Sequence, residues 1–290
     1  MEQIHLWEAP PVRPRNRRFH PLYQFKTTLV QETVGFFLYY AIAIDLSMLV
    51  ALGTIASTQA TPTETTIDKI TDFLNYAATH PVAVVRYLPS DMILHVHSDV
   101  SYLSEAKARS RAAGIFFLGN KFSDPVNPYM PLSNGVIHVL CKIMKNVMSS
   151  AAEAEIGSTF LTARDALPLR VCLEEMGHPQ PPTPIQVDNT TAVGFANSRI
   201  KMKATKAIDM RFYWIRDRIK QDEFFVYWGP GDGNTADYVS KHHSPTHHKN
   251  MRPSFFVNRL IVLKTSFHVY CEGVIIPVVL ECLTYLGTRH

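Results

Sequence analysis

The spacing of hydrophobic positions changes at Val82, and the change divides the chain into two regions. Before Val82 the apolar residues recur at helical intervals. After it they come in short runs, each the length of a strand and bounded by turn residues. Three of these runs follow one another directly, which predicts an antiparallel meander. The three predicted strands are residues 92–99, 113–119 and 135–142.

The region after the meander alternates between helical and strand-like patterns. A helix is predicted from Ser149, and Pro168 is expected to kink or end it before residues 169–177 continue helically. The order of elements is typical of an α/β fold with a mixed five-stranded sheet flanked by helices. The later elements are a strand at 184–189, helices at 190–198 and 205–220, a strand at 223–230 and a final helix at 234–242.

Two helical patterns come before the strands. The apolar stretch Val34–Leu52 is followed by a threonine-rich turn and then by a second helix. The predicted N-cap of this helix is Thr61, with Pro62 at the first helical position and Glu64 completing a capping box. Its apolar stripe can pack against the preceding stretch, which predicts a small helical unit over residues 30–81. The stripe consists of Ile67, Ile70, Leu74 and Ala77.

The apolar stretch also permits a membrane interpretation. Val34–Leu52 is long enough to cross a bilayer, and it follows basic residues as a signal anchor would. Its single charge, Asp45, lies near the middle, where it would be costly in lipid, and a soluble partner helix can cover the same surface. The sequence favours the soluble interpretation. A membrane-anchored protein with spans near Val34 and Val274 remains the alternative.

Composition indicates a globular protein. The chain has 290 residues, 46% apolar and 19% charged, which is enough to bury a core in one or two domains. The net charge of +4 permits a polyanionic partner, although much of the excess lies in the basic run Arg13–Arg18. The four cysteines lack zinc-ribbon and C-x-x-C spacing, which predicts buried thiols, no disulfide and a reducing intracellular compartment. They are Cys141, Cys172, Cys271 and Cys282.

Four acidic residues stand at the ends of predicted elements. Asp99 and Asp188 close the first and fourth strands, Glu155 lies one turn into the long helix, and Asp237 lies in the first turn of the last helix. Glu153, two residues before Glu155, should point away from it, because each helical residue turns the chain by roughly 100°. Each acid alone is commonly a turn former or a helix-dipole partner. Together they match a two-metal phosphodiester hydrolase, whose ions lie about 4 Å apart and need oxygen ligands on both sides.

These residues lie in segments that resemble the ribonuclease H domain of copia-type retrotransposon polyproteins. The resemblance implies a ribonuclease H-like fold, hydrolysis of the RNA strand of RNA–DNA hybrids, and two Mg²⁺ ions for which Mn²⁺ can substitute. It implies that Asp99, Glu155, Asp188 and Asp237 are the first to fourth metal ligands and the catalytic residues. The matching segments are "HSDVSY", "RSRAAGIFFLG", "SSAAEAEIGS", "IQVDNTTAV", "KAIDMRFYWIRDRI" and "GNTADYVSK".

The resemblance also implies a division of the chain and a set of partners. Residues 1–29 are a basic arm, 30–81 a helical connection segment like the end of a reverse transcriptase, 82–250 the ribonuclease H-like domain, and 251–290 a tail of unknown structure. An RNA–DNA hybrid is the expected substrate, and an upstream reverse transcriptase segment is a possible partner. The residues expected to contact nucleic acid are Asn189, Lys201, Lys203, Lys206 and Arg211.

The chain departs from the family pattern at several positions. Ile42 and Leu46 replace an arginine and a proline of the connection helix, and Ala207 replaces a frequent histidine. The polymerase motif Tyr-x-Asp-Asp is absent from the sequence, so this chain cannot copy nucleic acid by itself. An inactive remnant of such an element is therefore the second hypothesis. The histidine pairs within 241–249 admit a zinc site or contacts with phosphates.

Overall fold

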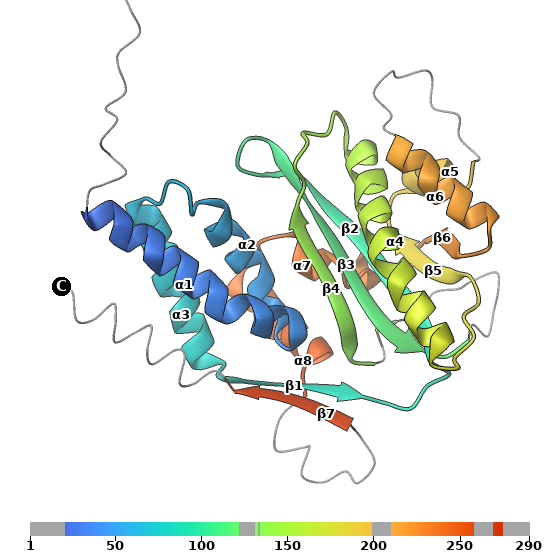
Figure 1. Cartoon of the computed structure of the whole chain (residues 1–290), viewed down its shortest axis with the longest axis horizontal. Helices are drawn as coiled ribbons and strands as arrows, with labels where there is room; N and C mark the ends of the chain where they lie inside the picture. Colours follow the sequence, from blue (N-terminus) through green and yellow to red (C-terminus); the bar gives the residue numbers. More distant parts are fainter. Residues whose placement is uncertain (1–20, 122–130, 133, 199–209, 258–268, 275–290) are drawn as a thin grey trace, which may run out of the picture.

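The computed structural model describes residues 21–121, 131–132, 134–198, 210–257 and 269–274. A sheet of five strands lies at the centre, with helices on both of its faces (Figure 1). A helical segment precedes the sheet in the chain, as the sequence predicted. The structure therefore confirms an α/β fold with a mixed five-stranded sheet flanked by helices.

The strand order of the main sheet is β4-β3-β2-β5-β6. The antiparallel meander consists of β2 (Ile93–Glu105), β3 (Arg109–Gly119) and β4 (Val136–Ile143). The strands β5 (Thr183–Val187) and β6 (Phe224–Trp228) then run parallel to β2. Because β2 and β5 are parallel neighbours, the residues that follow them emerge at the same edge of the sheet.

One face of the sheet is covered by α4 (Ala151–Glu175), α5 (Thr190–Ala196) and α6 (Met210–Lys220). The long helix α4 approaches β3 closely at Gly114, where a Cβ would lie only 2.7 Å from Cγ2 of Thr162. Pro168 lies inside α4, and the helix continues past it to Glu175. The predicted helical continuation is thus confirmed. These three helices and the sheet share a core that includes Val96, Phe116, Ile156, Phe195 and Val226.

The opposite face is covered by the helical segment that begins the described chain. It comprises α1 (Pro21–Ala43), the 3₁₀ turn η2 (Leu46–Met48), α2 (Leu49–Ser57) and α3 (Glu64–Thr79). The short helix α7 (Asp237–Ser240) and α8 (Pro245–Phe255) complete this layer. Apolar residues of the helices and of the sheet form one continuous core here. It includes Phe37, Leu52, Leu74, Ile115 and Phe117.

The start of α3 differs from the prediction. The N-cap is Thr63 rather than Thr61, and the backbone N–H of Thr63 donates to the hydroxyl of Thr66 over 3.1 Å. Glu64 is the first helical residue instead of the capping-box partner. Threonine can fill both positions of the box, so a threonine-rich turn offers several caps of similar strength. Local pattern alone therefore placed the start incorrectly.

The apolar stretch at 34–52 does not form one helix. It breaks after Ala43, where Asp45 is fully buried and its side chain accepts from the backbone N–H of Ser47. Two nitrogens of Arg252 in α8 donate to the two carboxylate oxygens of Asp45, over 3.1 and 2.8 Å. Among the residues that the structure describes, no helix combines the length and the hydropathy that a membrane crossing requires.

A second, two-stranded sheet joins distant parts of the chain. Strand β1 (Val82–Tyr87) pairs antiparallel with β7 (Val269–Val274) rather than with the main sheet (Figure 1). The helix α8 spans the predicted boundary at residue 250, and Phe256 beyond it is buried. Part of the predicted tail is therefore ordered against the preceding residues.

The cysteine prediction holds only in part. Cys141 is half-buried and Cys172 is exposed, and both are free thiols. The expectation of a buried thiol is wrong for Cys172, because it lies on a side of α4 that faces away from the sheet. The side chain of Cys271 and residue 282 lie outside the described part of the chain.

Candidate carboxylate site

Three of the four predicted acids come together at one edge of the main sheet. Asp188 directly follows β5, and Glu155 projects from α4. Asp99 lies inside β2, which continues to Glu105, so the prediction that it closes this strand is wrong. One carboxylate oxygen from each lies within 4.8 Å of the others. The parallel register that pairs Val96 with Ile185 places Asp99 and Asp188 side by side. The sequence predicted one site for four acids, and three of them converge here.

The first turns of α4 hold Glu155 against the strand that carries Asp99. Ser158, three residues after Glu155, donates its hydroxyl to the backbone carbonyl of Asp99 over 2.6 Å. Glu153 has a different role, because its carboxylate accepts from the backbone N–H of Ser149 over 2.7 Å at the helix start. Ser150 is the N-cap and accepts from the backbone N–H of Glu153. The predicted difference between the two glutamates is therefore present in the structure.

Burial makes these carboxylates difficult to ionise together. Asp99 is 2% and Glu155 6% exposed, whereas Asp188 is exposed. Burial, followed by the charges of Asp99 and Asp188, raises the pKa of Glu155 to about 9. Burial also raises the pKa of Asp99 to about 6, although the hydrogen bond from Ser240 and the charge of Lys241 oppose the shift. Like charges crowded in this way require a compensating cation when all are ionised.

The oxygen donors of this site fit a hard divalent cation. Oε2 of Glu155 is buried and accepts no hydrogen bond from the described residues. Leaving such an atom unsatisfied is costly, and a metal ion would satisfy it. Within the described part of the chain, this is the group whose metal-binding side chains converge. Asp99, Glu155 and Asp188 could therefore hold Mg²⁺ or Mn²⁺.

The fourth acid, Asp237, lies beside the three-carboxylate group. It is the first residue of α7, and its carboxylate is paired with the ammonium of Lys241, four residues later. The same ammonium lies 3.9 Å from Oδ2 of Asp99, and the hydroxyl of Ser240 donates to that oxygen over 2.5 Å. Asp237 thus reaches the site through Lys241.

Sequence reasoning did not place Ser240 or Lys241 beside the acids, and it considered His243 only as part of a histidine pair. Nε2 of His243 lies 3.1 Å from the carbonyl oxygen of Asp237 and 3.9 Å from its carboxylate. The spacing of Asp237 and Lys241 is an i, i+4 pair, which was the available signal. That spacing also suits an ion pair on a solvated helix face. It therefore did not distinguish a residue of the site from a surface residue.

The predicted nucleic-acid contacts are described only in part. Asn189 is the N-cap of α5, where its side-chain oxygen accepts from the backbone N–H groups of Thr191 and Ala192. This structural role occupies its oxygen, so a contact with nucleic acid would have to use its amide nitrogen. Lys201, Lys203 and Lys206 lie outside the described residues, and nothing is described of the Arg211 side chain.

The histidines after α7 do not converge as metal ligands do. The rings of His243 and His247 stack with their centroids 4.1 Å apart. His242 bonds instead to Thr54, and His248 bonds to the hydroxyl of Tyr238. Across the ranges that the structure describes, these histidines form no group of three converging ligand atoms. The geometry does not support the zinc hypothesis.

No family model matches the chain. Over 152 residues the chain is 26% identical to the Retrovirus-related Pol polyprotein from transposon TNT 1-94 of Nicotiana tabacum. The match covers 52% of this chain and 10% of that polyprotein. The chain therefore spans about a tenth of the length of the curated relative that it matches.

The similar solved structures are ribonuclease H domains and a viral reverse transcriptase. LC11-RNase H1 from compost is 12% identical with a TM-score of 0.37, and the match covers 51% of this chain and 92% of that one. The N-terminal RNase H domain of a Mycobacterium tuberculosis protein is 14% identical with a TM-score of 0.36, over 51% and 91%. A foamy viral protease-reverse transcriptase in complex with dsDNA is 16% identical with a TM-score of 0.34, over 55% and 99%.

Proposed function

We propose that this chain is a metal-dependent endonuclease that hydrolyses the RNA strand of RNA–DNA hybrids. We propose further that it is the ribonuclease H part of a copia-type retrotransposon polyprotein. The observation that carries the proposal is the convergence of Asp99, Glu155 and Asp188, together with the buried Oε2 of Glu155 that has no hydrogen-bond partner among the described residues. The similarity to a transposon Pol polyprotein supports it, and the predicted domain at 82–250 contains all three acids.

Each residue of the site has a defined task in this proposal. Asp99, inside β2, and Asp188, directly after β5, would hold the cations, and Glu155 would provide an oxygen from α4. Divalent cations bound there would supply activation of water and stabilisation of the charge on the leaving oxygen. Ser240 orients the Asp99 carboxylate through its hydrogen bond. Asp237 is the proposed fourth ligand, and it must release Lys241 when it binds a cation.

The proposed substrate is a polyanion, and basic side chains would hold it. Lys201, Lys203, Lys206 and Arg211 remain the proposed contacts with the phosphate backbone, which predicts that binding weakens as salt increases. The helical segment at 30–81 is proposed as a connection to an upstream reverse transcriptase segment.

A second candidate is a catalytically inactive remnant of such an element. The observation that favours it is the ion pair between Lys241 and Asp237, which already occupies the fourth acid. A remnant protein that kept the fold, but in which Asp237 no longer binds a cation, would bind a hybrid without cutting it.

Cleavage of a labelled hybrid tests the proposal. The full chain should cut the RNA strand with Mg²⁺ or Mn²⁺, and it should have no activity in EDTA because the site contains acids rather than a side-chain nucleophile. RNA alone and duplex DNA are the matched controls. Asp188→Asn should abolish cleavage and leave the fold intact, because Asp188 is exposed. Cleavage that persists in EDTA would exclude this mechanism, and binding without cleavage would favour the remnant.

A further inference from the structure

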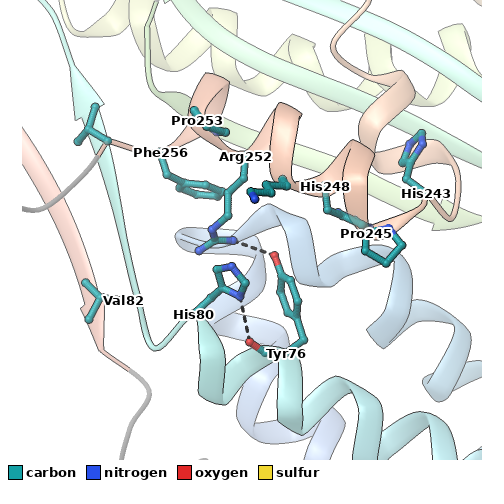
Figure 2. Close-up of a pocket in the computed structure, with 11 residues that line it drawn as sticks. Tyr76, His80, Val82, His243, Pro245, His248, Arg252, Pro253 and Phe256 are labelled. Carbon is teal, nitrogen blue, oxygen red and sulfur yellow. Dashed lines mark hydrogen bonds between the residues drawn. The ribbon is translucent and has the colours of Figure 1, made fainter.

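A pocket of about 620 Å³ lies between α3 and α8, outside the carboxylate site. Figure 2 shows Tyr76 and His80 on one side of it and Arg252, Phe256 and the α8 helix on the other. The helical segment contributes one wall, and the chain that follows the last acid contributes the other. A volume of this size is in the range of small-ligand sites, which run from roughly 300 to 1,000 Å³.

The polar lining of this pocket is basic. None of its 11 lining residues is acidic, and Lys249 in α8 is exposed. Arg252 also lines the pocket, but its charge is balanced by Asp45. Burial lowers the pKa of His248, and the charges of neighbouring histidines and of Arg252 lower it further. Because Arg252 is balanced and burial favours the neutral form of His248, Lys249 is the basic group of the described lining that a bound anion would offset.

Flat rings accompany the basic groups. The rings of Tyr76 and His80 stack with centroids 4.6 Å apart and an interplanar angle of 29°. The guanidinium of Arg252 lies 4.6 Å from the ring centroid of Phe256. Aromatic rings bind nucleic-acid bases by stacking, and lysines bind phosphates. A ligand that combines a base with a phosphate matches both features.

His243 connects this pocket with the carboxylate site. It lines the pocket, and its Nε2 lies 3.9 Å from the carboxylate of Asp237. A strand bound at the carboxylates could therefore continue into the pocket.

We propose that the pocket between α3 and α8 binds a nucleotide, with its base against Tyr76 and His80 and its phosphate near Lys249. The nucleotide could be free, or it could belong to a single-stranded extension of the nucleic acid. The second source rests on the proposed function, whereas the chemistry of the pocket does not.

Calorimetric binding to the full chain in EDTA tests this proposal without any cleavage. The probes are 5′-AMP, inorganic phosphate, a blunt RNA–DNA hybrid and the same hybrid with a single-stranded extension. We expect 5′-AMP to bind more tightly than phosphate, or the extended hybrid to bind more tightly than the blunt one. The first outcome identifies a site for free nucleotides, and the second a site for the extension.

The variants Lys249→Glu and His80→Ala should each weaken that preferred binding, Lys249→Glu by roughly tenfold because it reverses a charge beside the phosphate. Lys220→Glu, at the exposed end of α6 on the opposite face of the sheet, is the matched control and should bind as the unaltered chain does. Thermal unfolding by circular dichroism should show that all three variants fold.

Equal binding of phosphate and 5′-AMP, together with no gain from the extension, would overturn the proposal. So would an equal effect of Lys220→Glu and Lys249→Glu. A chain that fails to cut hybrids yet binds 5′-AMP in the pocket would refute only the proposed function. A chain that cuts hybrids but shows no nucleotide preference would refute only the pocket.

Discussion

Glu155 combines three properties at the residue scale that no other acid of the site combines. It is buried, one of its oxygens has no hydrogen-bond partner among the described residues, and two acids lie beside it. An ionised carboxylate in this setting lowers the stability of the fold, and it offers an oxygen ligand to a cation. Stability and function should therefore respond in opposite directions when Glu155 is replaced.

Glu155→Gln should remove metal binding and stabilise the metal-free protein at high pH. The pKa of Glu155 is raised from 4.5 to about 9 in the folded state, so folding favours the protonated form. That stabilisation is complete at low pH and is lost as pH rises towards 9. The variant cannot ionise, and we expect it to gain about 1–3 kcal/mol relative to the unaltered protein over this range. Thermal unfolding in EDTA at a series of pH values measures the gain.

Glu153→Gln is the matched control for this experiment. Its side chain accepts a hydrogen bond at the exposed start of α4, so the change should cost at most about 1 kcal/mol. A stability difference for Glu155→Gln that shrinks as pH rises would contradict the assignment.

Metal affinity should fall as the solution is acidified. The pKa of Asp99 is raised to about 6 and that of Glu155 to about 9, and protons compete with a cation for both carboxylates. Binding of Mn²⁺, followed by calorimetry without nucleic acid, should strengthen steadily as pH rises from about 5 to about 8. Affinity that is constant over this range would mean that these carboxylates are not the ligands.

At the element scale, the contact between α8 and the η2 turn depends on one buried ion pair. Arg252→Met leaves the fully buried Asp45 without its cation, and loss of one partner of a buried pair costs about 3–5 kcal/mol. Chemical denaturation should show this loss. Adding Asp45→Asn to Arg252→Met should recover part of it, because the uncompensated charge is then gone. Additive losses in the double variant would show that the pair is not coupled.

Local patterns were sufficient to predict the five strands of the main sheet, but not β1 or β7. The alternation of apolar residues and the turn residues indicated β2 and β5. Asp188 follows β5 and emerges at its end, whereas β2 continues past Asp99 to Glu105. The break at Asp45 could not be predicted in this way, because its partner Arg252 lies 207 residues away. The pairing of β1 with β7 depends on a similarly distant contact. The ion pair between Asp237 and Lys241 was missed, because an i, i+4 spacing fits a solvated helix face as well as a buried site.

At the scale of the whole molecule, the helical segment covers one face of the sheet together with α7 and α8. Removing residues 1–81 would expose the apolar face that includes Ile115 and Phe117. We expect the truncated chain to aggregate or to bind a hydrophobic dye, whereas the full chain should unfold cooperatively. Size-exclusion chromatography and dye fluorescence distinguish the two. A soluble, cooperatively folded fragment would show that the sheet does not need this cover.

The ion pair between Arg252 and Asp45 has a consequence for how the sequence can change in diverging copies of the gene. Only a short stretch of chain separates Asp237 from α8, so the placement of the fourth acid is tied to a residue near the other end of the sequence. Diverging copies of this gene should therefore not lose the two residues independently. A copy that replaces Asp45 with a neutral residue should tend to carry a neutral residue at position 252 as well, and a copy that has changed only one should be the less stable protein.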